Sequence, residues 1–73
     1  MKDFIFNKLK KITNKKFDEN SNIYSIGVDS LDLVEMITDV EEELNISILD
    51  EELTKLETIK DVITLLENKK NAS

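Results

Sequence analysis

One stretch, residues 27–44, decides the fold of this chain; it reads GVDSLDLVEMITDVEEEL. Apolar residues recur in it at helical spacing, at Leu33, Ile37, Val40 and Leu44. At about 100° per residue these four side chains form one narrow stripe, which predicts an amphipathic helix over residues 30–44. Asp29 or Ser30 can cap its first turn. The outer half of this helix is acidic, with Glu35, Asp39 and Glu42. Leu31 is the exception and lies almost opposite the apolar stripe.

Shorter helical patterns flank this segment. Ile5, Leu9 and Ile12 predict a helix over residues 2–13, and similar spacing predicts helices over residues 50–55 and 58–68. Asp50 and Thr58 are candidate caps, the second with Asp61 three positions later. We expect Asn45 to end the second helix and residues 69–73 to fray. Residues 14–25 read as a polar connection whose apolar members fold back onto the core: Phe17, Ile23, Tyr24 and, just beyond it, Ile26.

Composition supports helices and one domain over residues 1–73. The chain has no Pro and a single Gly, whereas a β-sandwich or barrel would need more turn residues. It has neither Cys nor His, which excludes a disulfide scaffold, a Cys/His zinc site and a His-dependent catalytic group. The predicted fold is therefore all-α, a small bundle of three long helices and one short helix. We expect a non-enzyme, a monomer and, without an apolar run that could span a bilayer or act as a signal peptide, a cytoplasmic protein.

Charge is distributed very unevenly along the chain. Residues 1–28 carry a net +3, residues 29–54 a net −10 without one Lys or Arg, and residues 55–73 a net +1. Such an acidic segment repels nucleic acid and suits a basic protein surface. A solvated helix face is the simpler reading of a charge run, but ten acids without a compensating base weaken it.

Ser30 is the candidate functional residue. It stands at a helix start, three positions after the only glycine, and its hydroxyl should be exposed near the positive end of the helix dipole. A phosphate attached there would be favoured by the unpaired N–H groups of the first turn. A serine at this position can also act only as a helix cap, and spacing alone does not separate the two readings.

The run from Gly27 to Glu35 resembles the phosphopantetheine attachment motif of acyl carrier proteins, G-x-D-S-L-x-x-V-E, and it matches without a gap. Three later stretches resemble further landmarks of that family: residues 39–44, 48–52 and 58–62. The resemblance implies the four-helix fold of the acyl carrier type. It also implies that a phosphopantetheinyl transferase joins the arm of coenzyme A to the Ser30 hydroxyl. The thiol that this chain lacks would then come from 4′-phosphopantetheine.

The resemblance further implies roles for the neighbours of Ser30. Asp29 would flank the attachment point and help the transferase recognise it. The second helix would meet basic patches on acyl-transferring and chain-elongating enzymes through seven residues: Leu31, Asp32, Val34, Glu35, Asp39, Glu41 and Glu42. Aliphatic residues facing inward would line a core that can loosen to shelter an acyl chain. The expected function is to carry acyl intermediates as thioesters in fatty-acid or related biosynthesis.

Three departures from the family pattern keep the pathway open. The segment before the motif is short, the usual D-L-G reads Ser25-Ile26-Gly27, and the usual proline is Leu49. A specialised carrier of polyketide or aminoacyl cargo is therefore an alternative. A second alternative is an acidic helical adaptor that is never modified and that would tolerate loss of the Ser30 hydroxyl. An EF-hand is a poor alternative, because Leu31 and Leu33 occupy positions where that loop needs ligands.

Overall fold

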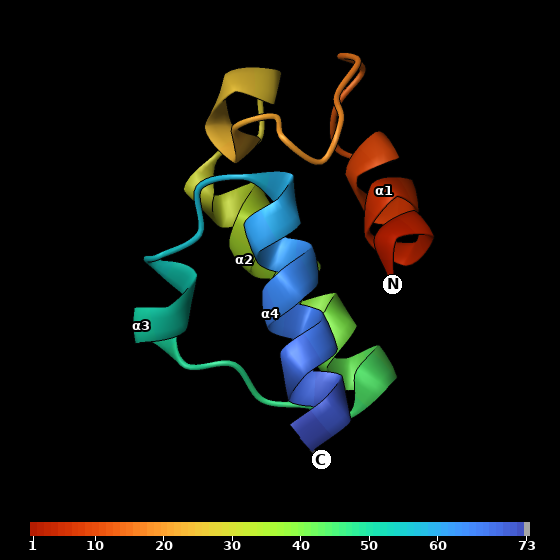
Figure 1. The fold of residues 1–73 in the computed structure, drawn as a ribbon. Helices are drawn as coiled ribbons and strands as arrows, with labels where there is room; N and C mark the ends of the chain where they lie inside the picture. The colour runs from red at the N-terminus through yellow and green to blue at the C-terminus, as the bar shows by residue number, and fades with distance from the viewer. Residues whose placement is uncertain (73) are drawn as a thin grey trace.

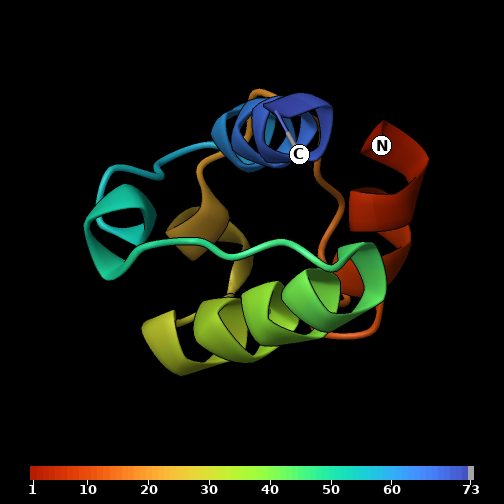
Figure 2. The ribbon, with the colours of Figure 1, turned by 90° about the horizontal axis from the view of Figure 1, so that it is seen from below.

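Four α-helices and one 3₁₀ helix make up the fold in the computed structural model, which describes residues 1–72 (Figure 1). The helices are α1 (Lys2–Lys10), η1 (Ile23–Ile26), α2 (Ser30–Leu44), α3 (Asp50–Leu53) and α4 (Ile59–Ala72). Helices α1 and α3 lie on opposite sides of the α2 and α4 pair, as both views show (Figures 1 and 2). The prediction of three long helices and one short helix is confirmed.

The core consists of aliphatic stripes from α1, α2 and α4, closed by residues of the connections. The fourteen core side chains are at most 6% exposed: Ile5, Leu9, Ile23, Ile26, Val28, Leu33, Met36, Ile37, Val40, Leu56, Ile59, Val62, Ile63 and Leu66. Helix α3 contributes no buried residue, and Leu53 only packs against the edge of the core. Because burial of apolar area supplies most of the folding free energy, α1, α2 and α4 carry the fold and α3 adds little to it.

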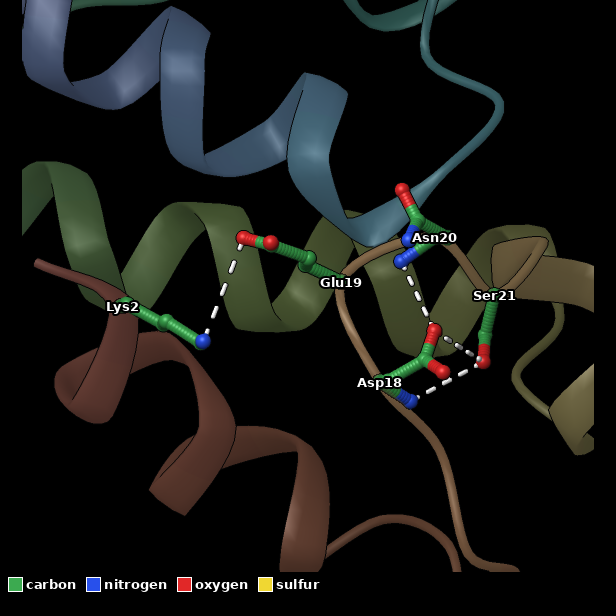
Figure 3. A network of polar contacts seen from close by, with 5 residues as sticks. All are labelled: Lys2, Asp18, Glu19, Asn20 and Ser21. Atoms are coloured by element: carbon green, nitrogen blue, oxygen red, sulfur yellow. Dashed lines mark hydrogen bonds and ion pairs between the residues drawn. The ribbon is translucent and has the colours of Figure 1, made fainter.

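Main-chain hydrogen bonds fix the long connection before η1 to the start of α4. The N–H of Ile23 donates to Glu57 O (2.9 Å), that of Ile59 to Ser21 O (3.1 Å) and that of Lys60 to Glu19 O (2.8 Å). A local network around Asp18 shapes the same turn (Figure 3): its carboxylate accepts from the Asn20 N–H, and its own N–H donates to Ser21 Oγ. This connection is thus an ordered part of the fold.

The structure corrects several expected boundaries. Helix α1 ends at Lys10 instead of residue 13, and α3 ends at Leu53, before residue 55. Helix η1 was not expected, and its Tyr24 is 48% exposed instead of packing onto the core. Asp50 lies inside α3 and does not cap it; the Glu52 carboxylate accepts from the Leu49 N–H. The tail was expected to fray, yet α4 continues to Ala72; residue 73 lies outside the described residues.

Helix α4 begins with the reciprocal cap that Thr58 and Asp61 predicted. Thr58 Oγ1 accepts from the Asp61 N–H (3.2 Å), while Asp61 Oδ2 accepts from the N–H groups of Thr58 (3.0 Å) and Glu57 (3.1 Å). These backbone donors hold the pKa of Asp61 below its ordinary value of 3.8. The ionised carboxylate therefore stabilises the end of the helix on which the N-terminal connection is fixed.

We expect Asp61→Asn to lower the free energy of unfolding at neutral pH by about 0.3–1 kcal/mol, because it removes a charge from a helix N-terminus. The stabilising effect of a lowered pKa exists above the unfolded-state pKa and is lost as pH falls through the folded-state pKa. The difference between variant and wild type should therefore vanish in acid. Urea unfolding at neutral and acid pH tests this, with Glu67→Gln as a control acid later in α4. A deficit that persisted in acid would assign it to packing and not to charge.

Candidate functional site

Ser30 is the first residue of α2 and its side chain is exposed. Asp29 caps the helix: its backbone is extended, and its Oδ1 accepts from the Asp32 N–H at 2.9 Å. Of the two candidate caps, the structure therefore selects Asp29. Since Ser30 is not needed as the cap, its hydroxyl is available for other chemistry.

Three residues, Gly27, Val28 and Thr13, fix the backbone that leads into Ser30. Gly27 ends η1 in the left-handed region, with φ 88° and ψ 10°, which costs glycine little. Val28 is only 1% exposed and anchors the loop in the core. Thr13 Oγ1 donates to the carbonyl of Ile26, so the start of the first connection, just after α1, also holds this turn. Ser30 is thus an exposed residue on a well-anchored loop and helix.

An apolar cavity of about 280 Å³ lies beside Ser30, between η1, α2 and α3. Its lining consists of Tyr24, Ser30, Leu33, Val34, Asp50, Leu53 and Thr54. One wall belongs to α2, whose stripe is buried, whereas the opposite wall is α3, which contributes no residue to the core. A group attached to Ser30 therefore has an apolar recess next to it.

The outward face of α2 presents most of the residues expected there. Leu31 is 75% exposed and Val34 46% exposed, and the carboxylates of Glu35, Asp39 and Glu42 are also exposed. Asp32 lies at the side of this face and is half-buried. Apolar and acidic side chains thus lie together next to Ser30, and such a surface is electrostatically complementary to a basic one.

Glu41 differs from the other six residues. It is half-buried, and its Oε2 accepts from the N–H of Ile48 at 3.0 Å, in the connection between α2 and α3. The structure thus gives this carboxylate an internal partner that the sequence did not suggest. Glu41 lies four positions after Ile37 and three before Leu44, so it borders the apolar stripe, whereas Glu42 lies four positions after the exposed Thr38. This spacing is the signal that could have separated the two residues.

Two lysines also reach this surface, which the sequence analysis did not predict: Lys8 in α1 and Lys11 directly after it. Lys8 Nζ lies 2.6 Å from Glu43 Oε2. A groove of about 150 Å³ between α1 and α2 is lined by Lys8, Lys11, Ile12, Asp32, Glu35, Met36 and Asp39. The only sequence signal for this contact was the contrast between the basic residues 1–28 and the acidic residues 29–54. The acidic face is therefore bordered on one side by cations of the same chain.

This arrangement supports attachment chemistry at a hydroxyl. The chain has no Cys or His, so Ser30 has no imidazole to activate it and no thiol beside it. A phosphate group on its Oγ would lie at the N-terminus of a 15-residue helix, where the dipole favours negative charge. The Asp32 N–H is taken by Asp29, which leaves those of Ser30 and Leu31 at the end of the helix.

Comparison with known proteins finds a consistent set of relatives. Residues 4–66 match the family described as "Phosphopantetheine attachment site". An acyl carrier protein homolog from Mycoplasmopsis pulmonis is 44% identical over 69 residues, 94% of either chain. The acyl carrier protein of Bdellovibrio bacteriovorus is 42% identical over 72 residues, 99% of this chain and 92% of its own. The crystal structure of an acyl carrier protein from Thermotoga maritima superposes with a TM-score of 0.76 at 28% identity, covering 92% of this chain and 81% of its own.

We expect Gly27→Ala to destabilise the protein by about 1–2 kcal/mol, because an alanine is strained in the left-handed region. The cause should be the backbone and not a clash, since an added Cβ would meet only Thr13 Oγ1, at 3.9 Å. Gly27→Asn should cost less, because asparagine tolerates this region better. Urea unfolding of the three proteins tests this. Equal losses for Ala and Asn would point to steric crowding instead.

Proposed function

Because the chain belongs to the acyl carrier protein family, we propose that Ser30 is the residue that bears its 4′-phosphopantetheine arm. The single observation that carries this proposal is the exposed Ser30 hydroxyl at the start of α2, in the middle of the attachment motif. A phosphopantetheinyl transferase would take the proton from the Ser30 hydroxyl, and its Oγ would attack the phosphate of coenzyme A that bears the pantetheine arm. The pyrophosphate bond would break, adenosine 3′,5′-bisphosphate would leave, and the arm would remain on Ser30 as a phosphodiester. The nearby N–H groups of the first turn would favour that negative charge.

The protein acts as a carrier, and the arm supplies its thiol. A chain without Cys has no thiol of its own that could hold an acyl group as a thioester. The residues around Ser30 position the arm and present it to enzymes; we infer that those enzymes catalyse each transfer. The lack of Cys agrees with a reducing compartment, and we propose a monomer in the cytoplasm.

The cavity beside Ser30 is the proposed shelter for the acyl part of the cargo. Leu33, Val34 and Leu53 give it apolar walls, and Ser30 stands at its lining. An alkyl chain transferred from water into such a site gains about 0.8 kcal/mol for each buried CH₂ group. This supports fatty acyl cargo over small polar cargo, although a polyketide carrier would use the same recess.

The outward face of α2 is the proposed surface for partner enzymes with basic patches, including the transferase. We include Leu31, Asp32, Val34, Glu35, Asp39 and Glu42. We leave out Glu41, because its carboxylate already accepts a hydrogen bond from Ile48. Each exposed ion pair contributes only about 0–1 kcal/mol, so such complexes should dissociate readily, as a shuttle between enzymes requires. The same charges would repel nucleic acid.

The attachment site is tested by intact mass after incubation with coenzyme A, magnesium and a broad-specificity phosphopantetheinyl transferase. Wild-type protein should gain the mass of one arm, and Ser30→Ala should gain nothing. Ser47→Ala, which removes another exposed serine, should behave as wild type. Asp29→Asn keeps an oxygen to cap α2, so slower modification of a folded variant would assign the Asp29 charge to transferase recognition.

A gain of mass in Ser30→Ala would move the attachment to another residue. If wild type gains no mass with this enzyme and protein purified from its own cells is also unmodified, the acidic adaptor becomes the better reading.

Partner recognition is tested by neutralising two carboxylates of the outward face. We expect Glu35→Gln/Glu42→Gln to raise the Michaelis constant for the transferase by about two- to tenfold at low salt, since two exposed ion pairs are lost. The difference should shrink at high salt. Glu57→Gln/Glu67→Gln changes the net charge equally at exposed sites outside α2 and serves as the control. Equal effects of the two pairs would mean that only overall charge matters.

A further inference from the structure

The acidic face of α2 is already met, along one side, by cations from the first helix and the turn after it. We propose that Lys8 and Lys11 act as internal competitors for the cations of a basic partner and so decide which carboxylates that partner can use. This inference rests on the proposed function of α2 as a recognition surface, and it assigns a specificity-determining role to two residues outside that helix.

Lys8 is held in place by two contacts. Its Nζ lies 2.6 Å from Glu43 Oε2 and 5.1 Å from the centroid of the Phe4 ring. Its side chain is only 17% exposed, whereas that of Glu43 is 53% exposed. A partner cation that approaches Glu43 therefore meets a carboxylate whose charge is already balanced by an ordered, partly desolvated lysine.

Lys11 extends this shielding along the groove. It lies on the opposite side of the groove from Asp32, Glu35 and Asp39, and within the described residues it forms no ion pair of its own. Its charge is therefore free to act on those three carboxylates together. A cation entering the groove would gain less from them and would be repelled by Lys11 and Lys8.

The carboxylates of α2 consequently fall into two classes. Asp32, Asp39 and Glu43 lie on the side facing α1 and are screened by its lysines, with Glu35 at the border. Glu42 neither lines that groove nor pairs with a lysine among the described residues. The shielding directs basic partners away from α1, toward Glu42 and the exposed Leu31.

The chain offers a matched control in the same charged segment. Lys10, Lys15 and Lys16 line a different cavity of about 510 Å³ together with Phe6, Thr13, Asn14 and Phe17, and no carboxylate lines it. Neutralising Lys15 and Lys16 changes the net charge as much as neutralising Lys8 and Lys11 does. Any difference between the two double variants therefore reports local shielding and not overall charge.

The test measures binding of an oligolysine peptide by isothermal titration in low salt. This probe does not depend on modification of Ser30. Lys8→Gln/Lys11→Gln should bind about three- to tenfold more tightly than wild type, because the cations of the peptide can then pair with carboxylates that no internal lysine screens. Lys15→Gln/Lys16→Gln should change binding distinctly less, and high salt should remove the difference. Equal gains for the two double variants would overturn the proposal.

A mutant cycle with Asp39 locates the effect. Asp39→Asn should weaken peptide binding only slightly in wild type and several-fold in the Lys8→Gln/Lys11→Gln background, because the carboxylate becomes available only there. The same loss in both backgrounds would contradict internal competition. If removing Lys8 destabilises the fold, Lys11→Gln alone keeps the test valid, because Lys11 is exposed and forms no ion pair within residues 1–72.

Measuring modification by the transferase in the same variants separates this inference from the proposed function. If wild type is modified neither by this transferase nor in its own cells, but the peptide series behaves as expected, the attachment proposal fails and the shielding stands. If wild type is modified but the two lysine pairs behave alike with both probes, the shielding fails and the attachment stands.

Discussion

Burial of the aliphatic stripe of α2 is the constraint on which the rest of the structure depends. Leu33, Met36, Ile37 and Val40 are each at most 3% exposed, so the rotation of this helix about its axis is fixed. Because an α-helix is rigid, the same rotation sends Leu31 and Glu42 outward and turns Glu43 toward α1. The core, the acidic face and the groove at Lys8 thus all follow from the way in which the apolar stripe of α2 packs.

The sequence predicts the parts of the fold that follow from local periodicity. Helix α2 has its expected bounds, and the Thr58–Asp61 cap is where the pattern placed it. The misses lie where tertiary contacts override local signals. Main-chain bonds to residues 57–60 order the polar connection before η1, and α4 runs on to Ala72. No periodic pattern encodes such contacts between distant segments.

The proposed attachment site is predictable from sequence because its residues are adjacent in the chain. Gly27, Asp29 and Ser30 take up their positions through a local turn and a local helix cap. The proposed recognition surface is less predictable, because it depends on what lies beside α2. Glu41 bonds to Ile48, and Lys8 pairs with Glu43, across segments that sequence spacing does not relate. Hydrogen bonds and ion pairs between elements decide which carboxylates are available.

Helix α3 has no buried residue, whereas the loop before η1 is joined to α4 by main-chain bonds. Local opening of α3 should therefore require far less free energy than global unfolding, and its amides should exchange with solvent long before those of α2. The wall that α2 forms beside Ser30 should therefore be rigid, whereas the wall that α3 forms should move more easily. If the cavity shelters acyl cargo as proposed, a longer guest would displace α3 outward while the core between α1, α2 and α4 stays closed. The range of acyl lengths that the carrier accepts would then depend on this four-residue helix.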